Sequence, residues 1–454
     1  MSQVSATVLS EDDARELANR ILDRSGAAEA IVQLRSSADG YTRFAANEIT
    51  TSGDATDVTA TLSVRVEGRE ASVEFNAFDD QTLVSAGERA RAMAEVLPVD
   101  PELQELLEQQ RYHEVEAWFE ATAGLDPAAR AASVRTMIAR ASGGGLVSSG
   151  FLARRASSVA VANTIGLFAY HRSTLASLTT TVRTRAGDGS GWAGDTGADW
   201  ARMRSPDDLV ERAVDKATRS AGATAVEPGA YTVVLEPTAA GSLLQLLGFA
   251  MDERAAEEGR SFFARPGGGT KRGEHVTASG ISLVSDPGSP LLRTQPFTDD
   301  GQPLARTTWV EDGVLTTLSR SRAWADRTAR QPIPAGNSLL LDAGGSGSTD
   351  DLVTGVERGL LVTRFWYIRS VDARSLLYTG LTRDGVFLIE RGRVTRPVKN
   401  LRFNESVIRM LGSVDAAGAP VRVVASESGG LGAAVAVPPL VVRDFQFTAL
   451  SDAV

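Results

Sequence analysis

The chain contains no cysteine, and this absence excludes several kinds of chemistry at once. Without a thiol there is no disulfide, no thiolate nucleophile and no zinc site built on cysteine ligands. The absence does not fix the compartment in which the protein works. Histidine is also scarce, with only His113, His171 and His275, so an imidazole-based site has few candidates.

Long apolar runs are missing as well. No run approaches the roughly 18 residues that a transmembrane helix needs, so we expect no membrane partner. The first twenty residues, MSQVSATVLSEDDARELANR, lack the basic and then apolar segments of a signal peptide. We therefore expect a cytoplasmic protein. The formal net charge of -10 argues against sequence-independent nucleic-acid binding, because such binding needs a basic surface.

What is present is the composition of an ordinary globular protein, with 43% hydrophobic and 23% charged residues. Its 454 residues predict two or three domains. Capping residues and apolar periodicity predict helices over 11–24, 80–96, 126–141 and 206–221. β-Branched, alternating segments predict strands at 30–34, 59–66 and 71–75, then an antiparallel meander over 151–184.

The second half is dominated by strands. After a strand at 231–235 and a helix at 238–258, closed by Gly259, we predict strands at 281–284, 307–310, 314–319, 360–367, 386–390, 394–398 and 440–447. Pro228-Gly229 marks a boundary nearby. The prediction is an α+β fold, with a mixed α/β N-terminal domain at 1–225 and a largely antiparallel β C-terminal domain at 226–454.

The histidines and the acidic residues are the candidate metal ligands. His113-Glu114 begins an apparent HExxH motif, but Ala117 stands where the second histidine is needed. Glu253 and Glu257 are four residues apart, so on a helix they share one face. With Asp252 and Glu258, they form a candidate site for Mg²⁺, Ca²⁺ or Mn²⁺. The alternative is a solvated helix face, neutralised by the neighbouring arginines.

Residues 364–406 are rich in groups that recognise ligands rather than react with them. Asn400, Arg402 and Asn404 alternate with Leu401 and Phe403, which on a strand separates a polar face from an apolar one. Amides and guanidinium groups on such a face bind the carbonyls or carboxylate of a peptide. An ordinary half-solvated sheet is the alternative. The candidate substrate-binding residues are Tyr367, Arg369, Arg383, Asn400, Arg402 and Asn404.

Together with the run LLQLLGFAMDERAAEEGRSFF at 243–263, this segment resembles the C-terminal half of the TldD/PmbA family of metallopeptidases and their catalytically silent partners. The resemblance implies an α+β N-terminal domain followed by a β-rich C-terminal domain. It also implies a dimer, often of one metal-bearing and one metal-free subunit, that cuts small or unfolded peptides, including precursors of modified peptide natural products.

The catalytic branch of the family carries HExxxH on the helix at 238–258. Matching Ser261-x-Phe263 to the family's Ser-x-Phe places Leu244 and Phe249 at the histidine positions and Gln245 at the glutamate position. Leucine and phenylalanine offer no lone pair to a metal, and glutamine is no general base. The family's later cysteine ligand is also missing. The resemblance therefore implies a PmbA/TldE-like subunit with no catalytic residue and no metal of its own.

The expected partner is a TldD-type subunit that bears HExxxH and zinc, in a heterodimer that processes peptides; a homodimer is the alternative. Alone, this chain is expected to be inactive. Two other functions stay open. One is a stand-alone peptide-binding or scaffold protein, and the other is a hydrolase that uses a hard cation bound by the carboxylates at 252–258.

Overall fold

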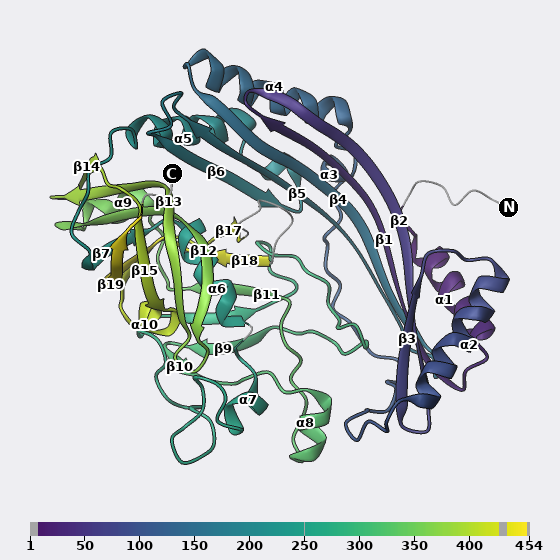
Figure 1. Cartoon of the computed structure of the whole chain (residues 1–454). Helices are drawn as coiled ribbons and strands as arrows, with labels where there is room; N and C mark the ends of the chain where they lie inside the picture. The colour runs from purple at the N-terminus through teal and green to yellow at the C-terminus, as the bar shows by residue number, and fades with distance from the viewer. Residues whose placement is uncertain (1–7, 249, 426–433, 452–454) are drawn as a thin grey trace.

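The computed structural model describes residues 8–248, 250–425 and 434–451, which fold into three sheets flanked by helices (Figure 1). The first sheet is antiparallel, in the order β3-β2-β1-β4-β5-β6. Its strands are β1 (Glu29–Ala45), β2 (Glu48–Val66), β3 (Arg69–Phe75), β4 (Val147–Asn163), β5 (Phe168–Arg183) and β6 (Ser190–Gly197). This long sheet arches over the rest of the molecule.

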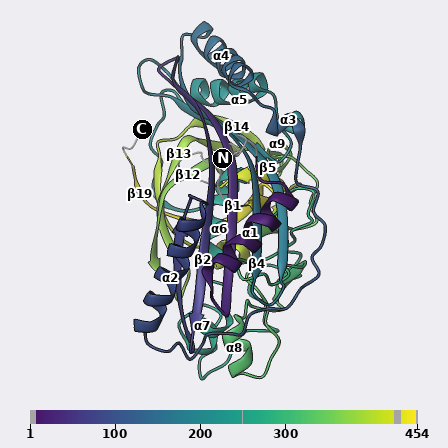
Figure 2. The same cartoon turned by 90° about the vertical axis from the view of Figure 1, so that its right-hand side faces the viewer.

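Four helices cover the outer face of the arch. The helices α1 (Glu11–Ser25) and α2 (Asp80–Val96) lie at one end, and α4 (Pro127–Gly143) and α5 (Pro206–Arg219) at the other, as Figure 2 shows from the side. Alternate residues of β1, from Val32 and Leu34 to Phe44, are buried against them. Short elements, α3 (Glu120–Ala123) and the 3₁₀ turn η1 (Trp200–Arg202), complete this part.

The predicted helix starts are confirmed by their caps. Ser10 accepts a hydrogen bond from the Asp13 amide at the start of α1, and Asp126 accepts one from the Ala129 amide at the start of α4. These side chains satisfy backbone N–H groups that have no partner inside the helix. The capping signals in the sequence therefore placed both helices correctly.

The second sheet runs in the order β10-β9-β8-β11-β18-β17. It contains β8 (Ser282–Ser285), β9 (Thr307–Glu311), β10 (Val314–Leu315), β11 (Ser338–Asp342), β17 (Val421–Val424) and β18 (Ala434–Val437). The strand predicted at 314–319 is wrong beyond Leu315. There the Ser319 amide donates to the Met251 carbonyl (2.9 Å), so the chain no longer pairs with β9 and contacts the segment around Met251 instead.

The third sheet contains a closed ring of five strands. The strands β12 (Arg358–Asp372), β7 (Gly229–Leu235), β19 (Leu440–Leu450), β15 (Leu401–Ser406) and β13 (Leu377–Glu390) pair in that order, and β13 pairs back with β12. The strands β14 (Arg393–Pro397) and β16 (Val414–Ala417) extend it. Phe365, Phe403 and Phe445 fill the interior, with the Phe365 and Phe445 rings stacked at 5.6 Å between centroids.

Small helices connect these strands: α6 (Pro237–Gly248), α7 (Glu253–Glu257), α8 (Arg322–Arg327), α9 (Thr349–Thr354) and α10 (Val407–Gly412). The single helix predicted over 238–258 is wrong, because it is divided into α6 and α7. Asp252 is extended and its side chain accepts from the Ala255 amide, so it starts a new helix instead of continuing the old one.

The α+β prediction is confirmed: one sheet with helices on its outer face is followed by two sheets that are mainly antiparallel. The parallel pairs are β11 with β18 and β12 with β7. The division at residue 225 stays a prediction, although the named strands of the first sheet end at Gly197 and those of the other sheets begin at Gly229. Among the described residues, no helix combines the length and the hydropathy that crossing a bilayer requires.

Candidate functional site

The helix α6 contributes an apolar side chain to the core at one of the positions where the resemblance places metal ligands. Leu244 is fully buried beside Leu243 and Leu247, within the cluster that also contains Met251. The Gln245 amide donates to the Ser242 carbonyl of the same helix (3.2 Å). The third position, Phe249, lies outside the described residues. Leucine supplies no donor atom, so the described part of this site does not fit a zinc ion.

The acidic residues at 252–258 form a network with arginines instead of a cation site. Glu253 is buried; its carboxylate pairs with Arg320 and accepts from Arg330 (2.9 Å). Glu257 accepts from Arg330 (2.8 Å) and from the indole N–H of Trp324 (2.7 Å).

Asp252 caps α7, and Glu258 accepts from Arg254 (3.0 Å) and Arg260. The hydrogen bonds from Arg260 and then Arg254 lower the pKa of Glu258. The carboxylate oxygens that a hard cation would bind thus already interact with arginines, with Trp324 or with the backbone of α7. In the described ranges no group of three or more histidine, cysteine or acidic side chains could hold a metal ion.

The three histidines lie on separate elements. His113 is exposed in the segment before α3, and His275 is exposed where its backbone bridges Val314. His171 is buried on β5, 7% exposed, and its Nε2 has no hydrogen-bond partner among the described residues. Burial lowers the pKa of His171 to about 4 from the ordinary 6.5.

We expect His171 to make the fold acid-sensitive. Between pH 6.5 and 4 the unfolded chain binds a proton on this side chain that the folded chain does not, so stability falls as the pH is lowered through this window. The full effect is about 3 kcal/mol. In urea unfolding from pH 7 to pH 4.5, His171→Gln should lose correspondingly less stability than the original chain. The exposed His275→Gln is the control, and parallel curves for all three proteins would contradict the expectation.

The six candidate substrate-binding residues do not form one surface. Arg402 and Asn404 are exposed on β15 while Leu401 and Phe403 are buried, so the predicted alternation is confirmed. Asn400 precedes that strand and accepts from the Thr382 hydroxyl (3.2 Å).

Tyr367 and Arg369 lie together on a different part of β12. Tyr367 is 54% exposed with a left-handed backbone (φ 54°), and the Arg369 guanidinium lies 4.0 Å from its ring centroid. Arg383 lies elsewhere, against Trp366 at 4.7 Å. A role in substrate binding stays a prediction for all six residues.

Arg383 lines a cavity of about 850 Å³, which lies where the first sheet meets the ring of five strands. We call it the Trp–Arg cavity. Its lining comes from β1, β4, β5 and β6 on one side and from β12 and β13 on the other: Arg43, Phe44, Ala45, Val147, Ser149, Gly150, Phe151, Thr179, Thr181, Arg183, Trp192, Arg364, Trp366, Arg383 and Asp384. The Arg364 guanidinium lies 4.6 Å from the Trp192 ring and 5.1 Å from the Trp366 ring.

A buried carboxylate holds this wall in place. Asp384, 2% exposed, pairs with Arg364 (3.1 Å) and accepts from the Ser190 hydroxyl of β6 (2.6 Å). Its backbone is left-handed (φ 56°), and the following Gly385 also has positive φ (123°). The pairing register between β12 and β13 shifts at this point, so Asp384-Gly385 forms a bulge.

Residues 379–385, which contain this Asp-Gly pair, thus lie inside β13 and not in a turn between strands. An Asp-Gly pair favours positive φ both in hairpin turns and in bulges, and sequence alone does not separate the two. The importance of Trp192, Arg364 and Asp384 was missed for the same reason. The Asp-Gly pair was the available signal, but nothing in the sequence pointed from it to Ser190, 194 positions away.

The inner face of the arch extends from this cavity as a polar surface. On it, Arg155 pairs with both oxygens of Asp39 (2.6 and 2.9 Å), and Tyr41 stacks on Phe151 at 6.0 Å between ring centroids. Guanidinium groups and aromatic rings beside strand backbone offer hydrogen bonds and apolar contacts to an extended peptide.

Two family models match this chain. Residues 116–221 match the model of the PmbA/TldA metallopeptidase central domain, and residues 228–449 match that of the PmbA/TldA metallopeptidase C-terminal domain. A Methanothermobacter thermautotrophicus protein described as a metalloprotease is 25% identical over 276 residues. That match spans 56% of this chain and 58% of the length of the relative.

Solved structures with the same fold include the following three. TldE from Thermococcus kodakarensis superposes with a TM-score of 0.82 at 18% identity, covering 96% of this chain and 99% of that one. A candidate modulator of DNA gyrase from Bacteroides thetaiotaomicron gives 0.81 at 21% identity, over 97% and 99%. Another such candidate, from Thermotoga maritima, gives 0.82 at 16% identity, over 96% and 100%.

Proposed function

Because this chain belongs to the TldD/PmbA family of metallopeptidase-related proteins, we propose that it is a metal-free subunit of a two-subunit peptidase. Its partner would be a relative that bears HExxxH and binds zinc. This chain would complete the chamber in which small or unfolded peptides, including precursors of modified peptide natural products, are cut. A cytoplasmic location is part of the same proposal.

The packing of α6 is the observation that carries this proposal. In the register with the family's catalytic branch, a ligand position is taken by Leu244, which is fully buried, and the general-base position by Gln245. A buried leucine side chain stabilises the fold by about 1.5–3 kcal/mol through burial alone, which a metal ligand at the same place would forgo. The helix thus serves packing, and metal-dependent chemistry would have to come from elsewhere.

The Trp–Arg cavity and the polar inner face support the chamber role. Arg364 and Arg383 stack on Trp366, which gives a rigid surface with both apolar area and hydrogen-bond donors. Such a surface suits peptides of varied sequence. It equally suits a stand-alone peptide-binding protein, which is the second candidate function.

The test is reconstitution. The chain is purified alone and together with an HExxxH-bearing relative from the same genome, and zinc content and cleavage of unfolded peptides are measured for each. We expect zinc and cleavage in the mixture and neither in this chain alone. Stoichiometric zinc or cleavage in this chain alone would overturn the proposal. A stable complex with peptides but no association with the relative would favour the stand-alone function.

A second arm of this experiment tests the chamber. Trp366→Ala in this chain should lower kcat/KM of the mixture about tenfold, the effect of losing about 1.4 kcal/mol of aromatic contact. Zinc content should not change, because Trp366 lies outside the metal-bearing partner. The control is Trp118→Ala, which removes a tryptophan that lies against Arg172, away from the cavity. Equal effects of the two variants would argue against a role for the cavity.

A further inference from the structure

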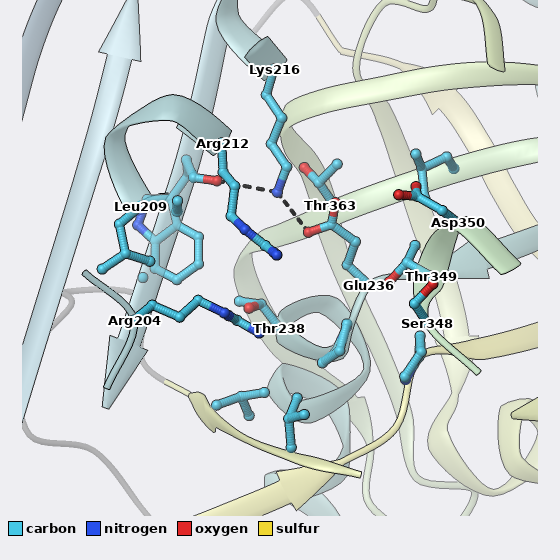
Figure 3. Close-up of a pocket in the computed structure, with 18 of the residues that line it drawn as sticks. Arg204, Leu209, Arg212, Lys216, Glu236, Thr238, Ser348, Thr349, Asp350 and Thr363 are labelled. Carbon is cyan, nitrogen blue, oxygen red and sulfur yellow. Dashed lines mark hydrogen bonds and ion pairs between the residues drawn. The ribbon is translucent and has the colours of Figure 1, made fainter. Parts of the chain in front are cut away.

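A second cavity, of about 540 Å³, shares Trp192 with the Trp–Arg cavity. Figure 3 shows residues that line it. We call it the arginine cavity. It is formed by α5 and β6, the start of α6, the loop before α9 and the strand β17. The polar side chains that line it include Arg204, Arg212, Lys216, Arg422, Thr238 and Thr349.

Two of the basic side chains in its wall already form ion pairs with acidic side chains. The Lys216 ammonium group pairs with Glu236 (2.6 Å) and donates to the Trp192 carbonyl (3.3 Å), as the dashed lines in Figure 3 show. Arg219 pairs with Asp215 (2.9 Å). Each pair joins one positive and one negative side chain, so these two pairs add no net charge to the cavity.

Arg204 and Arg212 are different. Their guanidinium groups extend into the cavity from the η1–α5 loop and from α5 (Figure 3). Within the described ranges neither guanidinium has a hydrogen bond or an ion pair; the contact of Arg204 is through its backbone N–H, which donates to Asp195 (2.8 Å). Both residues are exposed, so water and salt screen the repulsion between the two charges, and a bound anion would remove what is left of it.

Arg422 adds a third charge from β17. One of its terminal nitrogens donates to the Leu292 carbonyl (2.8 Å), but its Nε is buried and has no partner among the described residues. Burial lowers the pKa of Arg422 to about 10, so the group is still charged at neutral pH. An unsatisfied buried donor costs about 1–3 kcal/mol, more when it is charged.

The lining of the arginine cavity is positively charged, although the whole protein is negatively charged. Five basic side chains, Arg204, Arg212, Lys216, Arg219 and Arg422, face three acidic ones, Asp215, Glu236 and Asp350, which leaves two positive charges in excess among the lining residues. The Asp195 carboxylate, outside this lining, acts on Arg422. The whole chain carries -10. The twelve-residue helix α6 also begins at this wall, with Pro237 and Thr238, and its dipole adds positive potential there.

We propose that the arginine cavity binds a small molecule through a phosphate group held by Arg204 and Arg212. A phosphate carries about -1.5 to -2 charges at pH 7 and three acceptor oxygens, which matches the excess of two positive charges. A single carboxylate would neutralise only one of them. The Thr238 and Thr349 side chains line the same space and offer hydroxyl groups to the remaining oxygens. This inference does not depend on the peptidase proposal.

The test measures binding of inorganic phosphate and of pyrophosphate to the full chain by calorimetry, at constant ionic strength. We expect saturable binding of at least one of them. Arg204→Gln combined with Arg212→Gln should weaken it at least tenfold. The matched control is Arg135→Gln combined with Arg393→Gln, which removes the same charge from two exposed sites outside the cavity. It should bind like the original chain.

Several results would overturn the inference. One is no saturable binding of either probe to the original chain; another is an equal loss in both double variants, which would reveal a nonspecific charge effect. Sodium acetate provides the carboxylate arm: acetate binding as tightly as the phosphate probes would reject the phosphate assignment. Arg204→Lys with Arg212→Lys keeps the charge and should bind with intermediate strength, so a folding defect in the Gln variant would not hide the answer.

Discussion

Replacing Asp384 by alanine is expected to destabilise the protein by about 3–5 kcal/mol, because the change removes the buried carboxylate that pairs with Arg364. Both side chains are nearly inaccessible, at 1% and 7% exposure. The Ser190 hydroxyl loses its acceptor at the same time, so the contact between the first sheet and the ring is weakened along with the ring itself. The measurement is urea unfolding followed by tryptophan fluorescence, because Trp192 and Trp366 both lie beside Arg364.

The control for this variant is Asp415→Ala, which breaks an ion pair with Arg443 in which both side chains are more than half exposed. Surface pairs of that kind contribute about 0–1 kcal/mol. If Asp384→Ala were no more destabilising than Asp415→Ala, the bulge at Asp384-Gly385 would not be the support that its geometry indicates. Asp384→Asn, which keeps an acceptor for Ser190, should fall between the two.

Glu253→Ala should have a loss of similar size, again about 3–5 kcal/mol, since Arg320 is then buried and unpaired. Glu253 and Arg320 are both 5% exposed in their side chains, and Arg330 loses one of its two acidic partners. The loss should appear as a lower midpoint in urea. Glu211→Ala, which removes the exposed partner of Arg140, serves as the control and should be nearly neutral.

This second variant also separates two functions. A hydrolase that used the carboxylates at 252–258 would lose activity on Glu253→Ala while keeping its fold. The arginine network predicts the reverse, a destabilised fold and no activity to lose in the isolated chain. An unchanged urea midpoint for Glu253→Ala would therefore argue that the Glu253 carboxylate has a function and does not serve the stability of the fold.

The parts of the fold that follow from local rules could be predicted from the sequence. Ser10, Asp126 and Pro127 mark helix starts through hydrogen bonds that span only a few residues. The alternation on β15 follows from the two-residue period of a strand. The closed ring could not be predicted, because closing it needs β7 to pair with β12 and with β19, both more than 100 residues further along the chain.

The candidate site divides in the same way. That Leu244 and Gln245 bind no metal follows from their chemistry, wherever the chain places them. The two cavities could not be found, because each gathers side chains from distant elements: Arg43 and Arg383 in one, Arg212 and Arg422 in the other. The composition of residues 364–406 indicates recognition, but the fold divides these residues among different surfaces: Arg383 lines the Trp–Arg cavity, whereas Asn400 lines a smaller separate pocket.

The ring of five strands also sets the order in which the chain can fold during synthesis. Its first strand, β7, begins at Gly229, and the strand that lies between β7 and β15 is β19, which ends at Leu450. On the ribosome, the arch and its helices have all their strands long before the ring does. About 220 residues must be synthesised between the start of β7 and the end of β19. During that time one edge of β7 has no partner strand, and an unpaired edge can form non-native pairings. The arch can thus form early, whereas the wall of both cavities contributed by the ring is completed only when translation is nearly over.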